Sequence, residues 1–161
     1  MTTRTHAYDV VVTWTGNRGA GTAGYGTYGR DHESMAGQAP VLFGSADPAF
    51  RGDPARWNPE QLLVAALAQC HLLWYLHLAA EAGVVVTAYT DEAIGSMAEY
   101  RSGTGEFTQV TLRPAVTIAQ GSDPALAASL HDQAHEMCFI ARSVAFPVHH
   151  EPRIISAPQP Q

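Results

Sequence analysis

One long apolar run dominates the pattern of hydrophobic and polar positions along the chain. It extends from Leu62 to Ala80 and is interrupted at Gln69, His71 and His77. Its length is close to what a membrane-spanning helix needs. No aromatic belt or basic flank surrounds the run, however, and a helix that is apolar on every side is otherwise typical of a protein core. We therefore expect a buried core helix here and no membrane association.

Local signals define both ends of this helix. Asn58 can cap it, Pro59 suits the first helical position, and Gln61 stands where a capping box places its partner. Gly83 favours a stop, because glycine commonly follows the last turn of a helix. The sequence predicts a helix from Pro59 to about residue 82.

A second helix carries the same kind of signal at its start. Asp123 can cap it, and Pro124 suits its first position. We expect this helix to end near Met137 and a short helix to follow over residues 138–144.

The remaining pattern is typical of strands and turns. Strand-like segments, rich in Val and Thr or alternating in polarity, are expected at residues 6–14, 25–30, 34–43, 84–100, 106–119 and 146–155. Gly37 indicates a turn or bulge, residues 101–105 a hairpin, and residues 44–57 a long ordered loop. Helices and strands are segregated along the chain, which predicts an α+β fold.

Composition refines this picture. Of the 161 residues, 46% are apolar and 15% are charged, below the usual quarter. A monomer of this size would have difficulty covering its apolar surface, so the chain fits either one domain or one half of an intertwined dimer. We expect a single domain over residues 1–154 and a flexible tail over residues 155–161.

Charge and the N-terminus exclude two classes of protein. The formal net charge is −6 and no basic run occurs, whereas nucleic-acid binders need a basic face. The N-terminus lacks the apolar segment of a secretory signal. We therefore expect a cytoplasmic location, where two cysteines are more often thiols or a redox couple than a structural bridge.

The two cysteines are the candidate chemistry. Cys70 lies in the middle of the long helix and Cys138 where the second helix ends. Taken singly, each is most simply a small buried hydrophobic residue. Two central helices can bring both thiols together where they cross, however, and a disulfide can form if the Cα atoms approach within roughly 7 Å.

A cysteine reacts as the thiolate, which needs a nearby positive charge. The helix dipole fades within the first turn, and Cys70 lies about three turns in. His71 points about 100° away around the helix, and His77 lies about 10 Å further along it. The chain has nine arginines and no lysine, which favours an arginine; the candidates are Arg30, Arg51 and Arg56.

The chain resembles the osmotically induced protein C / organic hydroperoxide resistance (OsmC/Ohr) family. The resemblance lies in the motif 58–62 (NPEQL), in Ala65-Ala66, and in Cys70 ten positions after the glutamate. The second half agrees, with Ala134-His135 and Cys138 before a short helix and a closing strand. The resemblance covers residues 6–153. It implies long central helices wrapped by antiparallel sheets from both chains of an obligate, intertwined homodimer.

The resemblance also implies a reaction. Family members reduce organic hydroperoxides in stress defence through a peroxidatic thiol, here Cys70. A second thiol, here Cys138, resolves the sulfenic acid to a disulfide, while Glu60 and an arginine orient the thiolate. Dithiols or lipoylated proteins are implied as reductants, and no cofactor or metal is implied.

Two positions match the family's arginine. One branch carries it in a Gly-Arg-Asp stretch, which matches Arg30, and the other carries it in the loop before the NPE motif, which matches Arg51. We favour Arg51, then Arg30, then Arg56. Residues 49–57 (AFRGDPARW) are longer and richer in proline than in either branch, which indicates a distinct subgroup.

Glu60 has a geometric constraint of its own. An acidic residue in the first turn suits the helix dipole, and its carboxylate could also hold a guanidinium. Ten residues of helix separate it from Cys70 by roughly 15 Å. Our hypothesis is therefore that Glu60 acts on Cys70 of a partner chain, with the two long helices antiparallel.

Apolar side chains bear on the substrate. We expect a wall near the thiols that favours alkyl or lipid hydroperoxides, although such residues more often form core; its members are Leu67, Leu73, Trp74 and Phe139.

Two alternatives stay open. His131, His135 and Cys138 share one helix face and, with Cys70, could bind a metal, although no Cys-x-x-Cys or His-Glu-x-x-His motif accompanies them. The other alternative is a dimeric binding protein of the same fold whose cysteines are never cycled.

Overall fold

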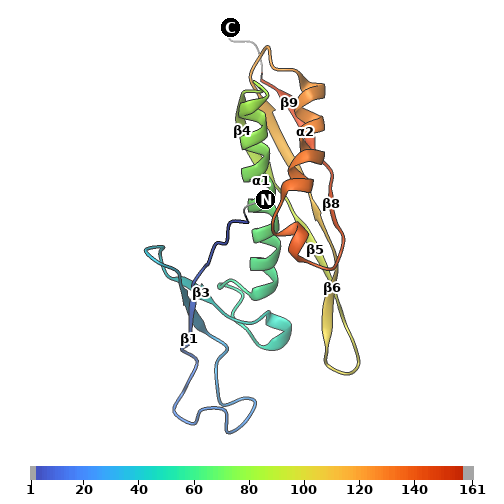
Figure 1. The fold of residues 1–161 in the computed structure, drawn as a ribbon. Helices are drawn as coiled ribbons and strands as arrows, with labels where there is room; N and C mark the ends of the chain where they lie inside the picture. Colours follow the sequence, from blue (N-terminus) through green and yellow to red (C-terminus); the bar gives the residue numbers. More distant parts are fainter. Residues whose placement is uncertain (1–2, 158–161) are drawn as a thin grey trace. The chain divides into compact units, whose positions relative to one another are not determined.

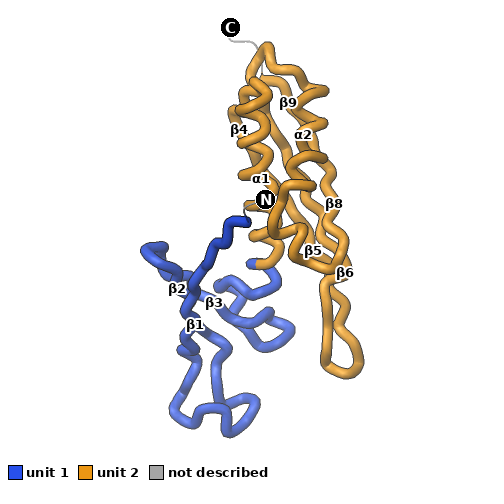
Figure 2. Tube along the Cα trace, viewed as in Figure 1, with its two compact units in different colours: residues 1–62 blue, residues 63–161 orange. Residues whose placement is uncertain are grey.

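The computed structural model describes residues 3–157, which form the α+β chain expected from the sequence (Figure 1). The chain divides into two compact units, residues 1–62 and residues 63–161 (Figure 2). The single domain over residues 1–154 stays a prediction. Of the predicted tail, Ile155 and Ser156 belong to the last strand, and residues 158–161 lie outside the described residues.

The first unit holds one antiparallel sheet in the order β1 (Val11–Trp14), β2 (His32–Met35) and β3 (Leu42–Gly44). The first strand is therefore shorter than the expected segment 6–14. A short 3-10 helix, η1 (Pro48–Phe50), lies within the loop predicted after β3.

Two strand predictions in this unit are wrong. Residues 25–28 form turns and bends and residues 29–30 no regular element, because the Thr27 hydroxyl donates to the carbonyl of Gly24 at 2.8 Å and closes a local loop in place of a sheet ladder. Residues 34–43 do not form one strand either. Gly37, with φ of 54°, turns the chain between β2 and β3.

Helix α1 (Pro59–Glu81) confirms the predicted long helix. The amide of Gln61 donates to Oδ1 of Asn58 at 2.8 Å, and the amide of Asn58 donates to Oε1 of Gln61 at 3.2 Å. This reciprocal pair is a capping box. Gly83 follows the helix with φ of 74°, a conformation that glycine adopts without steric cost.

The second unit combines two helices with two three-stranded sheets, ordered β4-β7-β9 and β5-β6-β8. The strands are β4 (Val86–Asp91), β5 (Ile94–Glu99), β6 (Gly105–Leu112), β7 (Pro114–Ile118), β8 (Val148–His150) and β9 (Arg153–Ser156). Helix α2 (Pro124–Met137) has the predicted bounds, and a 3-10 helix, η2 (Ala141–Ser143), follows it. Figure 1 shows α1 and α2 on the same side of these strands.

The three long strand predictions in this unit are each divided in two. The segments 84–100, 106–119 and 146–155 contain β4 and β5, β6 and β7, and β8 and β9. The two halves of each segment pair in different sheets. Pro114 opens β7 and Pro152 separates β8 from β9, where a residue without an N–H cannot extend a ladder. The hairpin predicted at residues 101–105 does join β5 to β6.

Helix α1 is not covered on all sides within one chain, contrary to expectation. Its buried residues recur every fourth position, at Leu67, His71, Tyr75 and Ala79, and so form one stripe. On another face Leu73 is 66% exposed. Among the described residues α1 is the one helix long and apolar enough to cross a membrane, a property that core helices of soluble proteins share.

Candidate functional site

The second unit brings the two cysteines together. Cys70 lies on α1 and is half-buried, whereas Cys138 directly follows the last turn of α2 and is 1% exposed. The Cys70 thiol lies close enough to Cys138 to raise the pKa of the Cys138 thiol. The expectation that two central helices place both thiols side by side is met by this geometry, and both cysteines are free thiols in the structure.

The surroundings of Cys138 keep its thiol protonated. Burial, and then the neighbouring Cys70 thiol, raise its pKa to about 11, while the amide of Ala141, 3.4 Å from the sulfur, opposes the rise. A thiol with this pKa is a poor nucleophile at neutral pH. Cys70, which is only half-buried, is the more accessible thiol of the pair.

The expected apolar wall is only partly present. Leu67 is fully buried in a core cluster with Val110 and Leu112. Trp74 and Phe139 do meet, edge to face with ring centroids 5.5 Å apart, and Phe139 is 65% exposed. The wall is thus a surface pair of aromatic rings, and Leu67 belongs to the core.

Two buried histidines on the helices that lead to the cysteines carry no positive charge. The Nε2 atom of His71 lies 2.9 Å from Nδ1 of His131, and both rings are fully buried. Burial, followed by neighbouring histidines, lowers the pKa of His71 to about 4 and that of His131 to about 3. Both rings are therefore neutral at neutral pH. His77 is exposed, with Nε2 3.6 Å from Oε1 of Glu81.

The geometry does not favour the metal alternative. His131 is committed to its bond with His71 and stacks on Tyr75, with ring centroids 4.0 Å apart. Over residues 3–157, no group of three or more His, Cys, Asp or Glu side chains is arranged to hold a metal ion.

The first unit contains a second candidate region, a cavity of about 280 Å³ that Arg30 and Glu60 both line. Oε2 of Glu60 is buried and has no hydrogen-bond partner in the described part of the chain. Sequence reasoning missed most of the other side chains that line this cavity, among them Trp14, Tyr28, His32, Ser45, Asp47 and Phe50. They are scattered along the chain with no shared motif, so only the fold assembles them.

Arg30 is held firmly at this cavity. Its guanidinium donates to the carbonyls of Tyr28 at 2.7 Å and Tyr25 at 3.0 Å, and it lies over both tyrosine rings at 4.2 and 4.5 Å. Cation–π contact and two hydrogen bonds fix its position.

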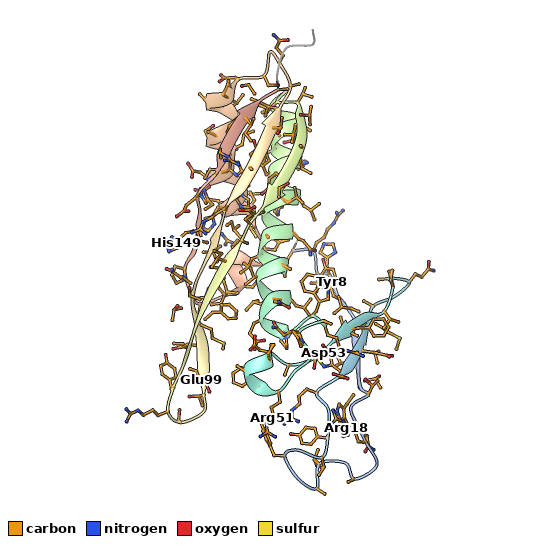
Figure 3. The ribbon with its side chains drawn as sticks, turned by 180° about the vertical axis from the view of Figure 1, so that it is seen from behind. Tyr8, Arg18, Arg51, Asp53, Glu99 and His149 are labelled. Carbon is orange, nitrogen blue, oxygen red and sulfur yellow. The ribbon has the colours of Figure 1, made fainter. Side chains whose placement is uncertain are left out.

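The other two arginines lie elsewhere. Arg51, labelled in Figure 3, is exposed on the loop before α1, has φ of 65°, and lies 4.9 Å from the centroid of Tyr25. Arg56 pairs with Asp31 and Asp53 at 3.9 and 3.6 Å. The structure thus brings Arg30, and not the favoured Arg51, to the cavity of Glu60.

Comparison with known proteins identifies the class. The sequence model of the family described as OsmC-like protein matches residues 52–153. The chain therefore belongs to the OsmC-like family, as its NPEQL motif and paired cysteines indicated.

Solved structures agree. An OsmC-like protein of unknown function from Vibrio cholerae is 32% identical, with 92% of this chain and 99% of that chain covered and a TM-score of 0.82. Two organic hydroperoxide resistance proteins share the fold. The one from Legionella pneumophila is 16% identical (coverage 94% and 98%, TM-score 0.67), and the one from Bacillus subtilis is 20% identical (93% and 98%, 0.62). No curated protein matches the chain in sequence.

Proposed function

We propose that this protein is a cytoplasmic thiol peroxidase that reduces organic hydroperoxides through Cys70 and Cys138. The observation that carries the proposal is the pair of neighbouring free thiols, one within α1 and one at the end of α2. Membership of the OsmC-like family supports it, because solved relatives of the same fold are named as organic hydroperoxide resistance proteins.

The proposed catalytic cycle has three steps. The Cys70 thiolate attacks the distal peroxide oxygen, the O–O bond breaks, and the alkoxide leaves and takes a proton; Cys70 becomes a sulfenic acid. The Cys138 sulfur then attacks the Cys70 sulfur, which releases water and forms a disulfide. An external dithiol, free or on a lipoylated protein, exchanges with this disulfide and restores both thiols.

The activating charge is proposed to come from Arg30 together with Glu60. They share one cavity, and the buried, unpartnered oxygen of Glu60 is suited to accept a hydrogen bond. Along a continuous helix Glu60 lies roughly 15 Å from Cys70 of its own chain. We therefore propose that the two residues act at Cys70 of a partner chain in a homodimer.

A thiol count tests the proposal directly. Reduced protein is mixed with one equivalent of cumene hydroperoxide, and free thiols are measured before and after. We expect a loss of two thiols per chain, reversed by dihydrolipoamide. Unchanged thiols would favour the alternative of a binding protein of the same fold, which the high pKa of Cys138 also permits.

Cysteine variants separate the two roles. C70S should abolish peroxide consumption. C138S should consume one equivalent per chain and then stall with a sulfenic acid that a dimedone-type reagent labels. Repeated turnover by C70S would rule the mechanism out.

A further inference from the structure

The helices that carry the two cysteines are tied together by one buried pair of histidines. His71 directly follows Cys70 on α1, and His131 lies two turns before Cys138 on α2. Their Nε2 and Nδ1 atoms are 2.9 Å apart, and the rings stack at 8° with centroids 5.3 Å apart.

A buried pair of histidines is energetically unfavourable at a core position. Each ring keeps its second nitrogen, Nδ1 of His71 and Nε2 of His131, buried and without a partner among residues 3–157. Buried polar atoms without partners cost free energy, whereas two apolar side chains of similar shape can replace such a pair at little or no cost. Stability alone therefore does not account for two histidines at this place.

A buried polar link can instead specify one arrangement of two helices, because every other alignment leaves its atoms unpaired. A second link points the same way: the hydroxyl of Tyr75 donates to the carbonyl of Ala127 at 3.1 Å. Tyr75 follows His71 along α1, whereas its partner Ala127 precedes His131 along α2, so the two helices run antiparallel. A slip of one turn, about 5.4 Å, would break the histidine link.

We propose that the hydrogen bond between His71 and His131 is a positioning device that sets the register of α1 on α2 and so holds the Cys70 thiol against Cys138. In this proposal the two histidines act through the helices that carry the thiols, as positioning residues. Disulfide formation tolerates Cα separations only up to roughly 7 Å, so register decides whether the bond can close. The use of this device in turnover rests on the proposed peroxidase function, but the device itself does not.

The test measures the thiol–disulfide equilibrium without peroxide. Oxidised glutathione converts the two thiols to the Cys70–Cys138 disulfide with release of two molecules of reduced glutathione, and the ratio of protein forms gives the equilibrium constant. In H71L/H131L we expect this constant to fall at least about tenfold, a potential shift of about 30 mV. The denaturation midpoint of the reduced protein should stay near that of the wild type.

Conservative variants provide the rescue. Glutamine places an amide near the position of Nε2, and asparagine places one near Nδ1, so H71Q/H131N should recover most of the equilibrium constant. If the H71L/H131L variant does not fold, the equilibrium constants of the single variants H131N and H131L give the same comparison with a smaller change. No difference between asparagine and leucine at this position would overturn the proposal.

Tyr75→Phe is the matched control. It removes the other buried link between α1 and α2, further from the thiols, and should change the constant less than about threefold. An equal fall of the equilibrium constant in Y75F and in H71L/H131L would show that any loosening of the contact between α1 and α2 has this effect, and it would overturn the proposal. Because no peroxide is used, failure of wild-type peroxide turnover would refute the proposed function and leave this result intact.

Discussion

Burial controls protonation around the thiol pair. It raises the pKa of Cys138 and lowers the pKa of His71 and of His131, because a low-dielectric interior disfavours every charged form. The neighbouring rings are therefore neutral at the pH where the thiols would react. These two rings therefore supply no positive charge to Cys70, in line with the proposal that an arginine does so.

The buried histidines predict an acid-sensitive fold. Their pKa values are lower in the folded protein than the ordinary value of 6.5, so the unfolded chain binds more protons as the pH falls below 6.5. Stability should therefore decrease between pH 6.5 and about 4, by up to about 1.4 kcal/mol per pH unit for each histidine. Urea denaturation at several pH values measures this slope. H71L/H131L should show a flatter slope, and an identical one would contradict the assignment.

The arginines can be ranked by their surroundings. Arg30 is fixed at the cavity of Glu60, whereas Arg51 is exposed. We expect R30A to slow oxidation of Cys70 by cumene hydroperoxide about tenfold or more, as removal of a positioned charge commonly does. R51A should stay within about threefold. Stopped-flow measurement of the second-order rate constant decides between the two arginines. A larger loss of rate in R51A than in R30A would make Arg51 the activating residue.

At the scale of elements, α1 owes its start to local chemistry. The capping box of Asn58 and Gln61 satisfies two amides, and Nδ2 of Asn58 also lies 3.4 Å from Oδ2 of Asp47. The cap therefore both begins the helix and holds the preceding loop.

Replacing the cap should be measurable. N58A should reduce the free energy of unfolding by about 1 kcal/mol, the usual cost of a lost N-cap. Q69A, an exposed position within the same helix, is the control and should change it by less than about 0.5 kcal/mol. Chemical denaturation of both variants gives the comparison, and equal effects would argue against a role for the cap.

At the scale of the whole molecule, only part of the apolar surface of α1 is buried within one chain. The helix buries one stripe in its own chain and leaves Leu73 and Leu76, three positions apart and therefore on one face, exposed. Phe139, which contacts Trp74 of α1, is exposed as well. Exposed apolar surface of this kind marks an association site. It supports the proposed homodimer, in which a second copy would cover this face.

A charge on that face should therefore separate the copies. L73E is expected to give a monomer in sedimentation analysis where the wild type is a dimer, because an unpaired carboxylate cannot be buried cheaply. Ser102→Glu, at an exposed position of the β5–β6 hairpin, introduces the same single negative charge and should leave the dimer intact. A wild-type monomer at micromolar concentration would refute the dimer.

Both helices could be predicted from the sequence because their signals are local. Asn58, Pro59 and Gly83 define α1, and Asp123 with Pro124 begins α2. Caps, proline and glycine act through the backbone within one turn, so neighbours in sequence suffice to read them. The α+β class followed from the same signals.

The strands and the site needed the tertiary structure. The long strand segments look continuous because polarity alternates through the breaks, yet their halves pair in different sheets, which depends on distant partners. The sequence by itself determined that Cys70 lies within one helix and Cys138 at the end of the other. Only the packing of α1 on α2 decided that the thiols meet and that His71 pairs with His131. Only the fold of the first unit brought Arg30 to the cavity of Glu60, because burial and distance between remote residues are properties of the folded chain.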